Sequence, residues 1–344
     1  MLDRRLDIGV VAPVAWRTPP RAYGPWELVA SVMTEGLVAA GHRVTLFATG
    51  DSLTAGTLSA AVPRGYEEDR SRDAKVCEYL HLGHAMARAQ EFDVVHNHFD
   101  FMALPYSRLV DTPMVTTIHG FSSEQIVEVY RRHDDRVHYV SISDSDRHAD
   151  LTYAATVYNG IDERDFRFGG SPGEHLLYFG RMHPDKGPHD AIEIARRAGR
   201  RLVMAGLIQD AGYWERAVLP HVDGERVRYV GNVGPAERRD LLADAAALLH
   251  PIHFDEPFGL SVAESMISGT PVIAYDRGSM PELIGQGVGG YRVADLDEAV
   301  EACAKIGDVD RAACRRSALD RFSAAAMVRG YEAVYAQVLR EHKA

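Results

Sequence analysis

Lysine, cysteine and long apolar runs are all scarce in this sequence of 344 residues. Only four of the 38 basic residues are lysines, and the three cysteines form no CxxC pair. An odd number of scattered cysteines argues against a disulfide framework or a zinc site and fits a reducing cytoplasm. No run of about 18 apolar residues is present, so we expect no membrane-spanning helix and no integral membrane association. The first residues also lack the apolar stretch of a signal peptide, and we therefore expect a cytoplasmic protein.

Basic residues are outnumbered by acidic ones, 38 against 49, which gives a net charge of −11. Nucleic acid requires a basic face for its phosphates, so this balance argues against nucleic acid as a partner. Apolar residues make up 46% of the chain, which is enough for two buried cores. At about 150 residues per domain, the length predicts two domains.

Short apolar runs alternate with longer amphipathic stretches along the whole chain. Strands that alternate with helices form βαβ units, and these units predict parallel sheets with helices on both faces. Amphipathic helices are expected at 28–40, 260–268 and 324–339. The expected strands are 8–12, 43–47, 93–96, 114–119, 137–142, 176–180, 202–205, 227–230, 247–250, 272–275 and 291–293.

A stretch rich in glycine and proline at 169–173 divides the chain, because such composition marks a linker and the strand series restarts after it. We predict an α/β protein with two Rossmann-like domains, residues 1–165 and 166–323, facing a central cleft. Residues 324–344 are expected to form a C-terminal helix that returns to the first domain. Ligands of such sheets bind beyond the carboxyl ends of the strands.

The glycine-rich signatures of two large nucleotide-binding classes are absent. Neither GxGxxG after the first strand nor GxxxxGK[ST] occurs, which argues against a dehydrogenase and a P-loop NTPase. Gly24 instead precedes an expected helix, where backbone N–H groups could bind a phosphate. The alternative is an ordinary connection between a strand and a helix.

Two cations, Arg181 and Lys186, follow the first expected strand of the second domain. Arginine binds two phosphate oxygens at once and lysine provides a compact charge, so the pair suits a diphosphate. Lysine is also rare in this arginine-rich chain, so its general composition does not account for Lys186. The alternative is a pair of solvated loop charges.

Two glutamates, Glu256 and Glu264, stand eight residues apart on either side of a Pro-Phe-Gly turn. We expect Ser261 to cap the following helix and Glu264 to lie on its first turn. The N–H groups of 258–261 would then point at an anion. Carboxylates accept hydrogen bonds from vicinal hydroxyls, which ribose and hexose both present. The alternative is a capping glutamate and a surface glutamate.

This segment resembles the E-x7-E motif of glycosyltransferase family 4, whose members are retaining enzymes of the GT-B fold. The resemblance extends over nearly the whole chain, and the motifs are specific as a set. The further matching segments are 93–98, 116–120, 157–162, 180–187 and 269–274.

The resemblance implies a role for each matching residue of the second domain. Glu264 would bind the ribose hydroxyls of a nucleotide, and Glu256 would bind the donor hexose. Arg181 and Lys186 would bind the diphosphate and stabilise it as it leaves, and Val233 would border the base. Further donor contacts would come from the start of the helix, at Phe258, Gly259, Leu260 and Ser261.

In the first domain, the resemblance places His119 beside the transferred sugar and Gly24 against the phosphates. The family usually carries a second glycine after Gly24, where this chain has Pro25. Proline has no N–H to donate to a phosphate, so the contact at Gly24 is less secure than those of the second domain.

His96 and His98 share a face of an expected strand, and with His119 they could form a metal site. With 16 histidines in the chain, we favour residues that line the cleft. The family resemblance agrees, because it implies that no metal is needed. We expect no metal and no cofactor, the nucleotide-sugar being a co-substrate.

The expected function is retaining transfer of a hexose from a nucleotide diphosphate sugar, most readily a UDP-sugar, to a hydroxyl. The resemblance implies a front-face route in which the leaving phosphate helps to deprotonate the acceptor. Residues 1–165 carry 16 basic and 24 acidic side chains, a poor surface for anionic lipid. We therefore favour a small-molecule or natural-product acceptor. The alternatives are a GDP-mannose-dependent or glycolipid-directed glycosyltransferase, a nucleotide-sugar epimerase, and a non-catalytic nucleotide-sugar-binding protein.

Overall fold

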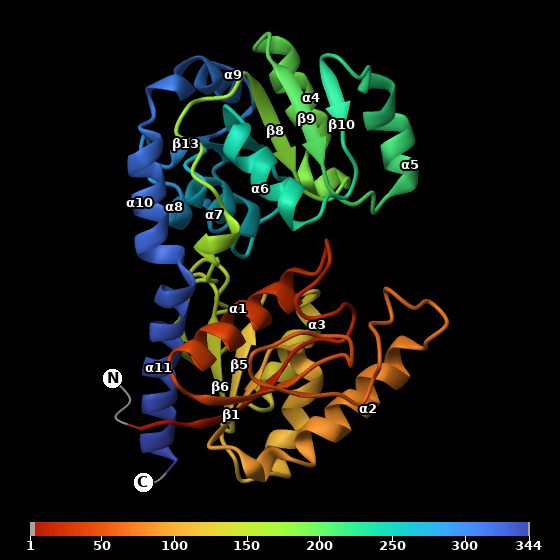
Figure 1. The fold of residues 1–344 in the computed structure, drawn as a ribbon, viewed down its shortest axis with the longest axis vertical. Coiled ribbons are helices and arrows are strands. Elements are labelled where there is room, and N and C mark those ends of the chain that lie inside the picture. The colour runs from red at the N-terminus through yellow and green to blue at the C-terminus, as the bar shows by residue number, and fades with distance from the viewer. Residues whose placement is uncertain (1–3, 343–344) are drawn as a thin grey trace. The chain divides into compact units, whose positions relative to one another are not determined.

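The computed structural model describes residues 4–342, which form two compact units (Figure 1). The first unit contains residues 4–160 together with 324–342, and the second contains residues 161–323. Residues 161–165, which we expected in the first domain, therefore lie in the second unit. The C-terminal helix lies in the first unit.

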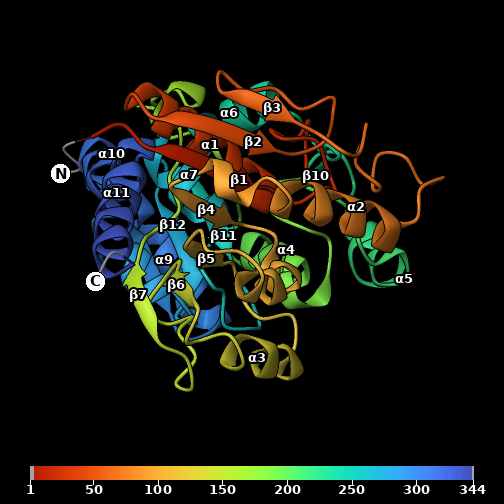
Figure 2. The ribbon, with the colours of Figure 1, turned by 90° about the horizontal axis from the view of Figure 1, so that it is seen from below.

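The first unit is built on a sheet of seven parallel strands in the order β3-β2-β1-β4-β5-β6-β7, which can be followed in Figure 2. β1 lies inside the sheet, β2 and β3 are added on one side of it, and β4 to β7 are added on the other. The strand order therefore reverses between β1 and β4. The strands are β1 (Asp7–Val11), β2 (Arg43–Phe47), β3 (Thr57–Ser59), β4 (Val94–Asn97), β5 (Met114–Ile118), β6 (Val137–Ser141) and β7 (Tyr153–Thr156).

Helices cover this sheet, and the last helix of the chain, α11, packs against the first, α1. A Cβ at Gly36 would lie 2.5 Å from Cγ2 of Val328, so glycine permits the close approach of these two helices. The helices are α1 (Pro25–Ala39), α2 (Ala74–Met86), α3 (Glu124–Arg131) and α11 (Ala324–Glu341), with short η1 (Ala89–Glu91) and η2 (Asp100–Arg108).

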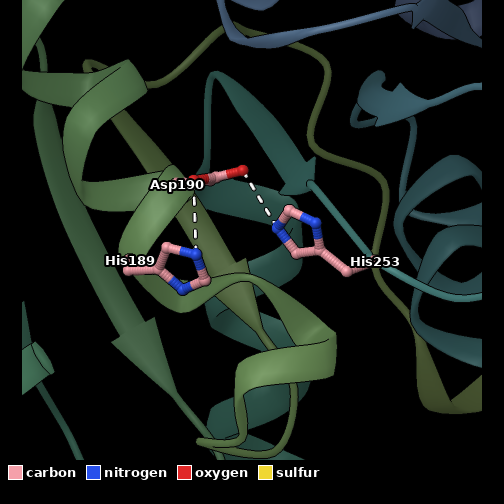
Figure 3. A group of neighbouring side chains, drawn as sticks. All are labelled: His189, Asp190 and His253. Atoms are coloured by element: carbon pink, nitrogen blue, oxygen red, sulfur yellow. Dashed lines mark ion pairs between the residues drawn. The ribbon is translucent and has the colours of Figure 1, made fainter.

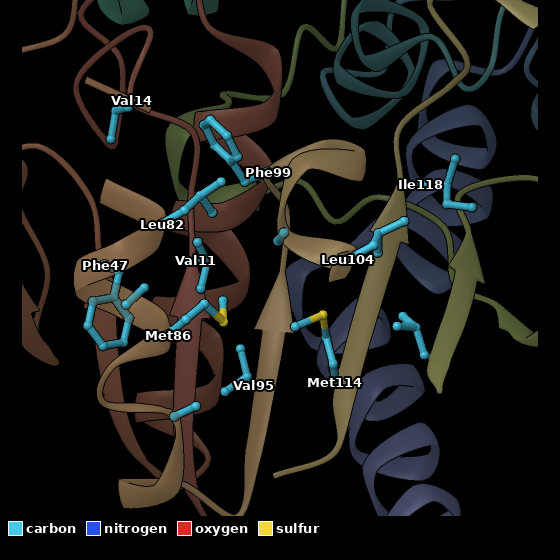
Figure 4. Close-up of a cluster of buried hydrophobic side chains, with 14 of the residues drawn as sticks. Val11, Val14, Phe47, Leu82, Met86, Val95, Phe99, Leu104, Met114 and Ile118 are labelled. Atoms are coloured by element: carbon cyan, nitrogen blue, oxygen red, sulfur yellow. The ribbon is translucent and has the colours of Figure 1, made fainter. Parts of the chain in front are cut away.

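The core of the first unit lies between one face of the sheet and α2 with η2 (Figure 4). Alternate strand residues point to the same face, which places their apolar side chains together. Burying one such side chain contributes about 1.5–3 kcal/mol. The cluster includes Val11, Phe47, Leu82, Met86, Val95, Leu104, Met114 and Ile118, all at most 4% exposed.

The second unit is built on a sheet of six parallel strands in the order β10-β9-β8-β11-β12-β13. Strand order again reverses near the middle, between β8 and β11. The strands are β8 (His175–Phe179), β9 (Arg201–Ala205), β10 (Val227–Tyr229), β11 (Ala247–His250), β12 (Val272–Tyr275) and β13 (Gly290–Val293).

Helices also follow the strands of the second unit. They are α4 (Pro188–Arg197), α5 (Ala211–Tyr213), α6 (Pro235–Asp244), α7 (Leu260–Ile267), α8 (Met280–Leu283), α9 (Leu296–Lys305) and α10 (Arg311–Phe322), with short η3 (Glu163–Asp165), η4 (Pro184–Lys186), η5 (Trp214–Val218), η6 (Leu219–His221) and η7 (Ile306–Asp308). No helix among residues 4–342 is long and apolar enough to cross a membrane.

The two parallel sheets confirm the predicted α/β class with two Rossmann-like domains. All eleven expected strands form, with ends shifted by one residue at most. Two edge strands, β3 and β7, were missed. The first has three residues, and every residue of the second is half-exposed, so neither gives the buried apolar run that marks a central strand.

Candidate active site

The turn that carries Lys186 touches the end of β11. Gly187, at φ +64°, ends this turn and caps α4. A Cβ at this position would lie 1.9 Å from the carbonyl oxygen of Pro251. Only glycine fits both the left-handed backbone and this close approach. β8 and β11 are paired neighbours in the sheet, and the glycine sets Lys186 beside the loop that follows β11.

Lys186 and Glu256 form an ion pair in this place, through Nζ and Oε2. Both side chains are largely buried, at 16% and 13% exposure. The ammonium also lies 4.5 Å from the centre of the Phe254 ring, a cation–π contact. His250, at the end of β11, places Nε2 3.6 Å from the same carboxylate oxygen.

The Glu256 carboxylate is ionised because of these neighbours. Burial alone would raise its pKa, but the Lys186 ammonium and then His250 outweigh burial and lower the pKa to about 2. Burial lowers the pKa of His250, so that imidazole is neutral. The pair is therefore a buried charge of each sign with a neutral imidazole beside it.

The backbone of Glu256 is held from behind by the loop after β12. The N–H of Ser279 donates to the carbonyl of Glu256 over 2.9 Å. Gly278, at φ +53°, leaves room for this contact, since a Cβ there would lie 2.3 Å from the Glu256 nitrogen. The Ser279 hydroxyl also donates to the carbonyl of Phe258 over 2.7 Å, which fixes the turn before α7.

Helix α7 begins at Leu260, in the segment that follows Glu256, and its N-cap is Gly259 rather than Ser261. The prediction of a serine cap was wrong because the left-handed backbone of Gly259, at φ +89°, starts the helix earlier. Among the described residues, the N–H groups of Gly259, Leu260 and Ser261 have no protein acceptor. They are the unpaired donors that a helix start offers to an anion.

Glu264 lies deeper in α7 than expected, because the helix starts at Leu260 and no acidic residue falls on its first turn. Its carboxylate is 2% exposed and pairs with the guanidinium of Arg238 on α6, over 3.1 Å. The guanidinium lies over the Phe166 ring, 5.3 Å from its centre. Burial raises the pKa of Glu264, and Arg238 works against that rise. The site thus contains a second buried carboxylate with its own cation.

Arg181 also lies at the end of β8, and Val233 lies after β10, another strand of the same sheet. Arg181 follows β8 and hydrogen bonds to the side-chain amide oxygen of Gln209. Its own carbonyl accepts from the Tyr178 hydroxyl over 2.8 Å. Val233, after β10, is 7% exposed. Arg181 and Lys186 therefore both lie beyond the carboxyl end of β8, but they face different partners.

In the first unit, Trp26 connects the start of α1, where Gly24 lies, to His119. Gly24 is the N-cap of α1, at φ +149°, and Pro25 is the first residue of the helix. Trp26 follows, and its ring stacks on His119 with centroids 5.4 Å apart and planes 21° apart. The start of α1 and the end of β5 are therefore joined within this unit.

A chain of neutral histidines runs inward from His119. Its Nε2 lies 3.0 Å from Nδ1 of His98, and the rings of His98 and His96 are 4.4 Å apart. His96 hydrogen bonds to the Tyr335 hydroxyl of α11 over 2.6 Å and to the Thr117 hydroxyl over 2.8 Å. Burial lowers the pKa of both His96 and His119 to about 3. The imidazoles are therefore hydrogen-bonding groups without charge at neutral pH.

Glu27 is a titratable residue beside Gly24 that sequence reasoning missed. Its carboxyl is 3% exposed and accepts from the N–H of Trp16 over 3.1 Å. Burial raises its pKa to about 7, although the hydrogen bonds from backbone N–H groups act in the opposite direction. The signal was present in the sequence, as an acidic residue on the first turn of an apolar helix.

The other residues missed from the sequence are His250, Phe254, Arg238 and Ser279. His250 ends an expected strand, so the sequence could place it at the edge of the sheet but could not predict its contact with Glu256. Arg238 is one of many arginines, and only the packing of α6 on α7 selects it. Their roles depend on contacts between segments far apart in the chain.

Two family models match the chain and together span most of it. Residues 27–165 match "Glycosyltransferase Family 4", and residues 173–308 match "Glycosyl transferases group 1". The chain is a glycosyltransferase of the family 4 type. Glycogen synthase of Mycobacterium tuberculosis is 29% identical over 363 aligned positions, which cover 88% of this glycosyltransferase and 87% of that protein.

Solved structures similar to this glycosyltransferase share its fold, which is GT-B. AviGT4, a glycosyltransferase involved in avilamycin A biosynthesis, aligns at a TM-score of 0.73 with 23% identity, over 97% of this chain and 98% of that one. HepE of Anabaena, solved with UDP and glucose, aligns at a TM-score of 0.74 with 18% identity, over 96% and 100%. The expected family and fold are thus confirmed.

Proposed function

We propose that this glycosyltransferase transfers a hexose from a UDP-sugar to a hydroxyl of a small-molecule or natural-product acceptor, with retention of the anomeric configuration. The observation that carries the proposal is the buried Lys186–Glu256 ion pair at the carboxyl ends of β8 and β11. A diphosphate needs a cation and a hexose needs hydrogen-bond acceptors, and this pair offers one of each. The solved complex of HepE with UDP and glucose supports the nucleotide.

Because the leaving group is a diphosphate, the main demand of the reaction is to stabilise negative charge as the glycosidic bond breaks. An ammonium has three N–H donors, and the ion pair with Glu256 uses one of them. The others are available to phosphate oxygens. Arg181 and the N–H groups that start α7 add donors, and preorganised donors of this kind lower the barrier as charge develops. The proposed transfer therefore requires no metal, and the leaving phosphate helps to remove the acceptor proton.

The two carboxylates of the motif have separate tasks in this proposal. Glu256, with its pKa lowered to about 2, is ionised at neutral pH, and it accepts from hexose hydroxyls. Glu264, paired with Arg238, accepts from the ribose hydroxyls. Val233, buried after β10, borders the base.

In the first unit, we propose that His119 contacts the transferred sugar as a neutral imidazole. Its pKa of about 3 and its stacking on Trp26 suit hydroxyl recognition rather than binding of an anion. The described cysteines Cys77, Cys303 and Cys314 are free and buried, which supports the proposed cytoplasmic setting.

The decisive experiment measures release of nucleoside diphosphate and formation of product with Lys186→Ala and Glu256→Ala. Each substitution should reduce turnover at least 1,000-fold while the circular dichroism spectrum stays that of a folded protein. Lys305→Ala is the matched control, because it removes an exposed lysine of the same unit. Turnover near that of the unmodified enzyme in both site variants would contradict the assignment.

Donor and acceptor are tested separately, by the rise in melting temperature that a bound ligand causes. UDP-glucose and other UDP-sugars should raise the melting temperature more than GDP-mannose. A larger rise with GDP-mannose would overturn the proposed nucleotide. Conversion of the donor without an acceptor would indicate an epimerase, and activity only on anionic vesicles would overturn the small-molecule acceptor. The anomeric configuration of the product, read by NMR, tests retention.

A further inference from the structure

Two histidines and an aspartate gather beside α4, in a place that the proposed transfer does not use (Figure 3). His189 and Asp190 lie on the first turn of α4, and His253 lies in the loop after β11. Nε2 of His189 is 3.4 Å from Oδ1 of Asp190, and Nε2 of His253 is 3.1 Å from Oδ2. Both imidazoles therefore direct a nitrogen at one carboxylate.

The spacing of these donor atoms fits a small divalent cation. One ligand atom from each residue lies within 4.8 Å of the others, and among residues 4–342 this is the single group of three such residues. A tetrahedral zinc ion, with bonds of about 2.0–2.1 Å, holds its ligand atoms roughly 3.3 Å apart. The two nitrogen–oxygen separations, 3.4 and 3.1 Å to the two oxygens of one carboxylate, are close to that value. Two imidazoles and a carboxylate are also a usual zinc ligand set.

Neighbouring hydroxyls hold the candidate ligands in position. The Tyr213 hydroxyl hydrogen bonds to Nδ1 of His189 over 2.6 Å, which leaves Nε2 of that ring for a metal. The Tyr275 hydroxyl donates to Oδ2 of Asp190 over 2.7 Å. Such second partners orient metal ligands and commonly account for a 10–100-fold effect on affinity. A solvated ion pair needs no such hydroxyl partners, so the two tyrosines favour a metal site.

The two rings are also preorganised and open to solvent. His189 and His253 stack with centroids 5.4 Å apart and planes 9° apart. Their side chains are 40% and 41% exposed, whereas that of Asp190 is 18% exposed. The carboxylate is therefore anchored inside while the imidazole edges are accessible to an ion and to water ligands.

We propose that His189, Asp190 and His253 bind one zinc ion, with water completing the coordination. The ion would join the first turn of α4 to the loop after β11. The N–H of His253 already donates to the carbonyl of Asp185 in η4, just before α4, over 2.7 Å. Lys186 ends η4, and Glu256 lies in the same loop as His253. The zinc site does not rest on the proposed transfer, and it supplies none of the groups assigned to it.

The test is a zinc titration of untagged, chelator-treated protein against a chromophoric zinc indicator. The full-length protein should bind one equivalent of zinc with micromolar or tighter affinity, and the double variant H189A/H253A should lose at least 100-fold in affinity. His221→Ala, which removes an exposed histidine of the same unit, is the control and should bind as the unmodified protein does. Equal binding by the double variant, or no saturable binding by the unmodified protein, would overturn the proposal.

Two further measurements separate a built site from surface binding. Co²⁺ in place of zinc should give the visible absorption of a four-coordinate histidine site, and H189A/H253A should abolish it. Tyr213→Phe should weaken zinc binding 10–100-fold without removing a ligand. An unchanged affinity in that variant, or a cobalt spectrum of six-coordinate water, would contradict the proposed geometry. Melting temperatures recorded with chelator show that each variant is folded. These readouts involve no sugar transfer, so their failure leaves the proposed function intact, and the reverse also holds.

Discussion

Each of the two units has its own parallel sheet covered by helices, but the polar groups at the strand ends differ in charge between the units. In the second unit, buried carboxylates are paired with cations, Glu256 with Lys186 and Glu264 with Arg238. In the first unit, the groups at the strand ends are neutral histidines that contact hydroxyls and one another. Two sheets of similar architecture thus present charge in one case and neutral hydrogen bonds in the other.

The difference follows from what burial does to each kind of group. A buried carboxylate stays ionised only beside a cation, whereas an imidazole lowers its pKa and remains neutral. In the proposed function, the charges of the second unit serve the diphosphate and the donor hydroxyls, and the neutral His119 of the first unit contacts the transferred sugar. Substitutions that alter charge, backbone, protonation or a single hydroxyl test this contrast in turn.

The largest effect is expected for Glu256→Gln, which removes one charge of the buried pair. Turnover should fall about 1,000-fold, or about 4 kcal/mol of transition-state stabilisation, because Lys186 loses its ionic partner and the hexose loses a carboxylate. Steady-state kinetics with the best donor measure the loss. Glu301→Gln, on the exposed side of α9, is the control and should keep full activity. A tenfold loss or less would show that the charge of the pair matters little.

A smaller but still severe effect is expected for Gly187→Ala, which tests how the charged pair is assembled. Gly187 and Gly199 both have φ +64°, but a Cβ meets Pro251 at the first position and nothing within 4 Å at the second. The left-handed backbone alone costs an alanine about 1–2 kcal/mol. Gly187→Ala should therefore destabilise by at least about 2 kcal/mol more than Gly199→Ala, in urea unfolding. Equal losses would mean that the turn adjusts without the close contact.

The first unit, with its uncharged buried groups, is tested by Glu27→Gln and the pH dependence of stability. The pKa of Glu27 rises from 4.5 to about 7 on folding, so between these values the native state binds more protons than the unfolded state. Stability from this residue is therefore complete below pH 4.5 and falls as pH rises through 7, by on the order of 2–3 kcal/mol. Urea unfolding at pH 5 and at pH 8 measures this change in the free energy of unfolding, and Glu27→Gln should not show it. Glu35→Gln, on the same helix, should retain it. A wild-type slope in Glu27→Gln would show that Glu27 is ionised in the native state.

The smallest effect is expected for Tyr335→Phe, which removes one hydroxyl from the neutral network. His96 would keep its contact with Thr117 and lose the 2.6 Å hydrogen bond to α11. A buried group left without its partner costs about 1–3 kcal/mol. Urea unfolding should show a loss of stability near the lower end of this range. Tyr79→Phe, at an exposed residue of α2, should show no loss. Stability unchanged in Tyr335→Phe would mean that the histidine finds another partner.

Much of the architecture could be predicted because parallel strands buried on both faces leave continuous apolar runs in the sequence. Residues 247–250 and 272–275 were expected as strands and form β11 and β12 with the same ends. The E-x7-E spacing also located Glu256 and Glu264. Their cations could not be paired in advance, because Arg238 is chosen among many arginines by helix packing. Serine is a common N-cap, so Ser261 was a reasonable prediction, but the left-handed Gly259 started α7 first.

The position of α11 bears on the order in which the chain acquires its structure during synthesis. The second unit is continuous in sequence, so all its strands are available once residue 323 has been made. The first unit begins at the N-terminus, yet Tyr331 and Tyr335 supply hydroxyls to Thr117 and His96 from the last helix. Residues 4–160 are therefore made before the second unit, but their unit is completed after it. Until residues 324–341 leave the ribosome, the buried histidine network lacks the partners that α11 provides.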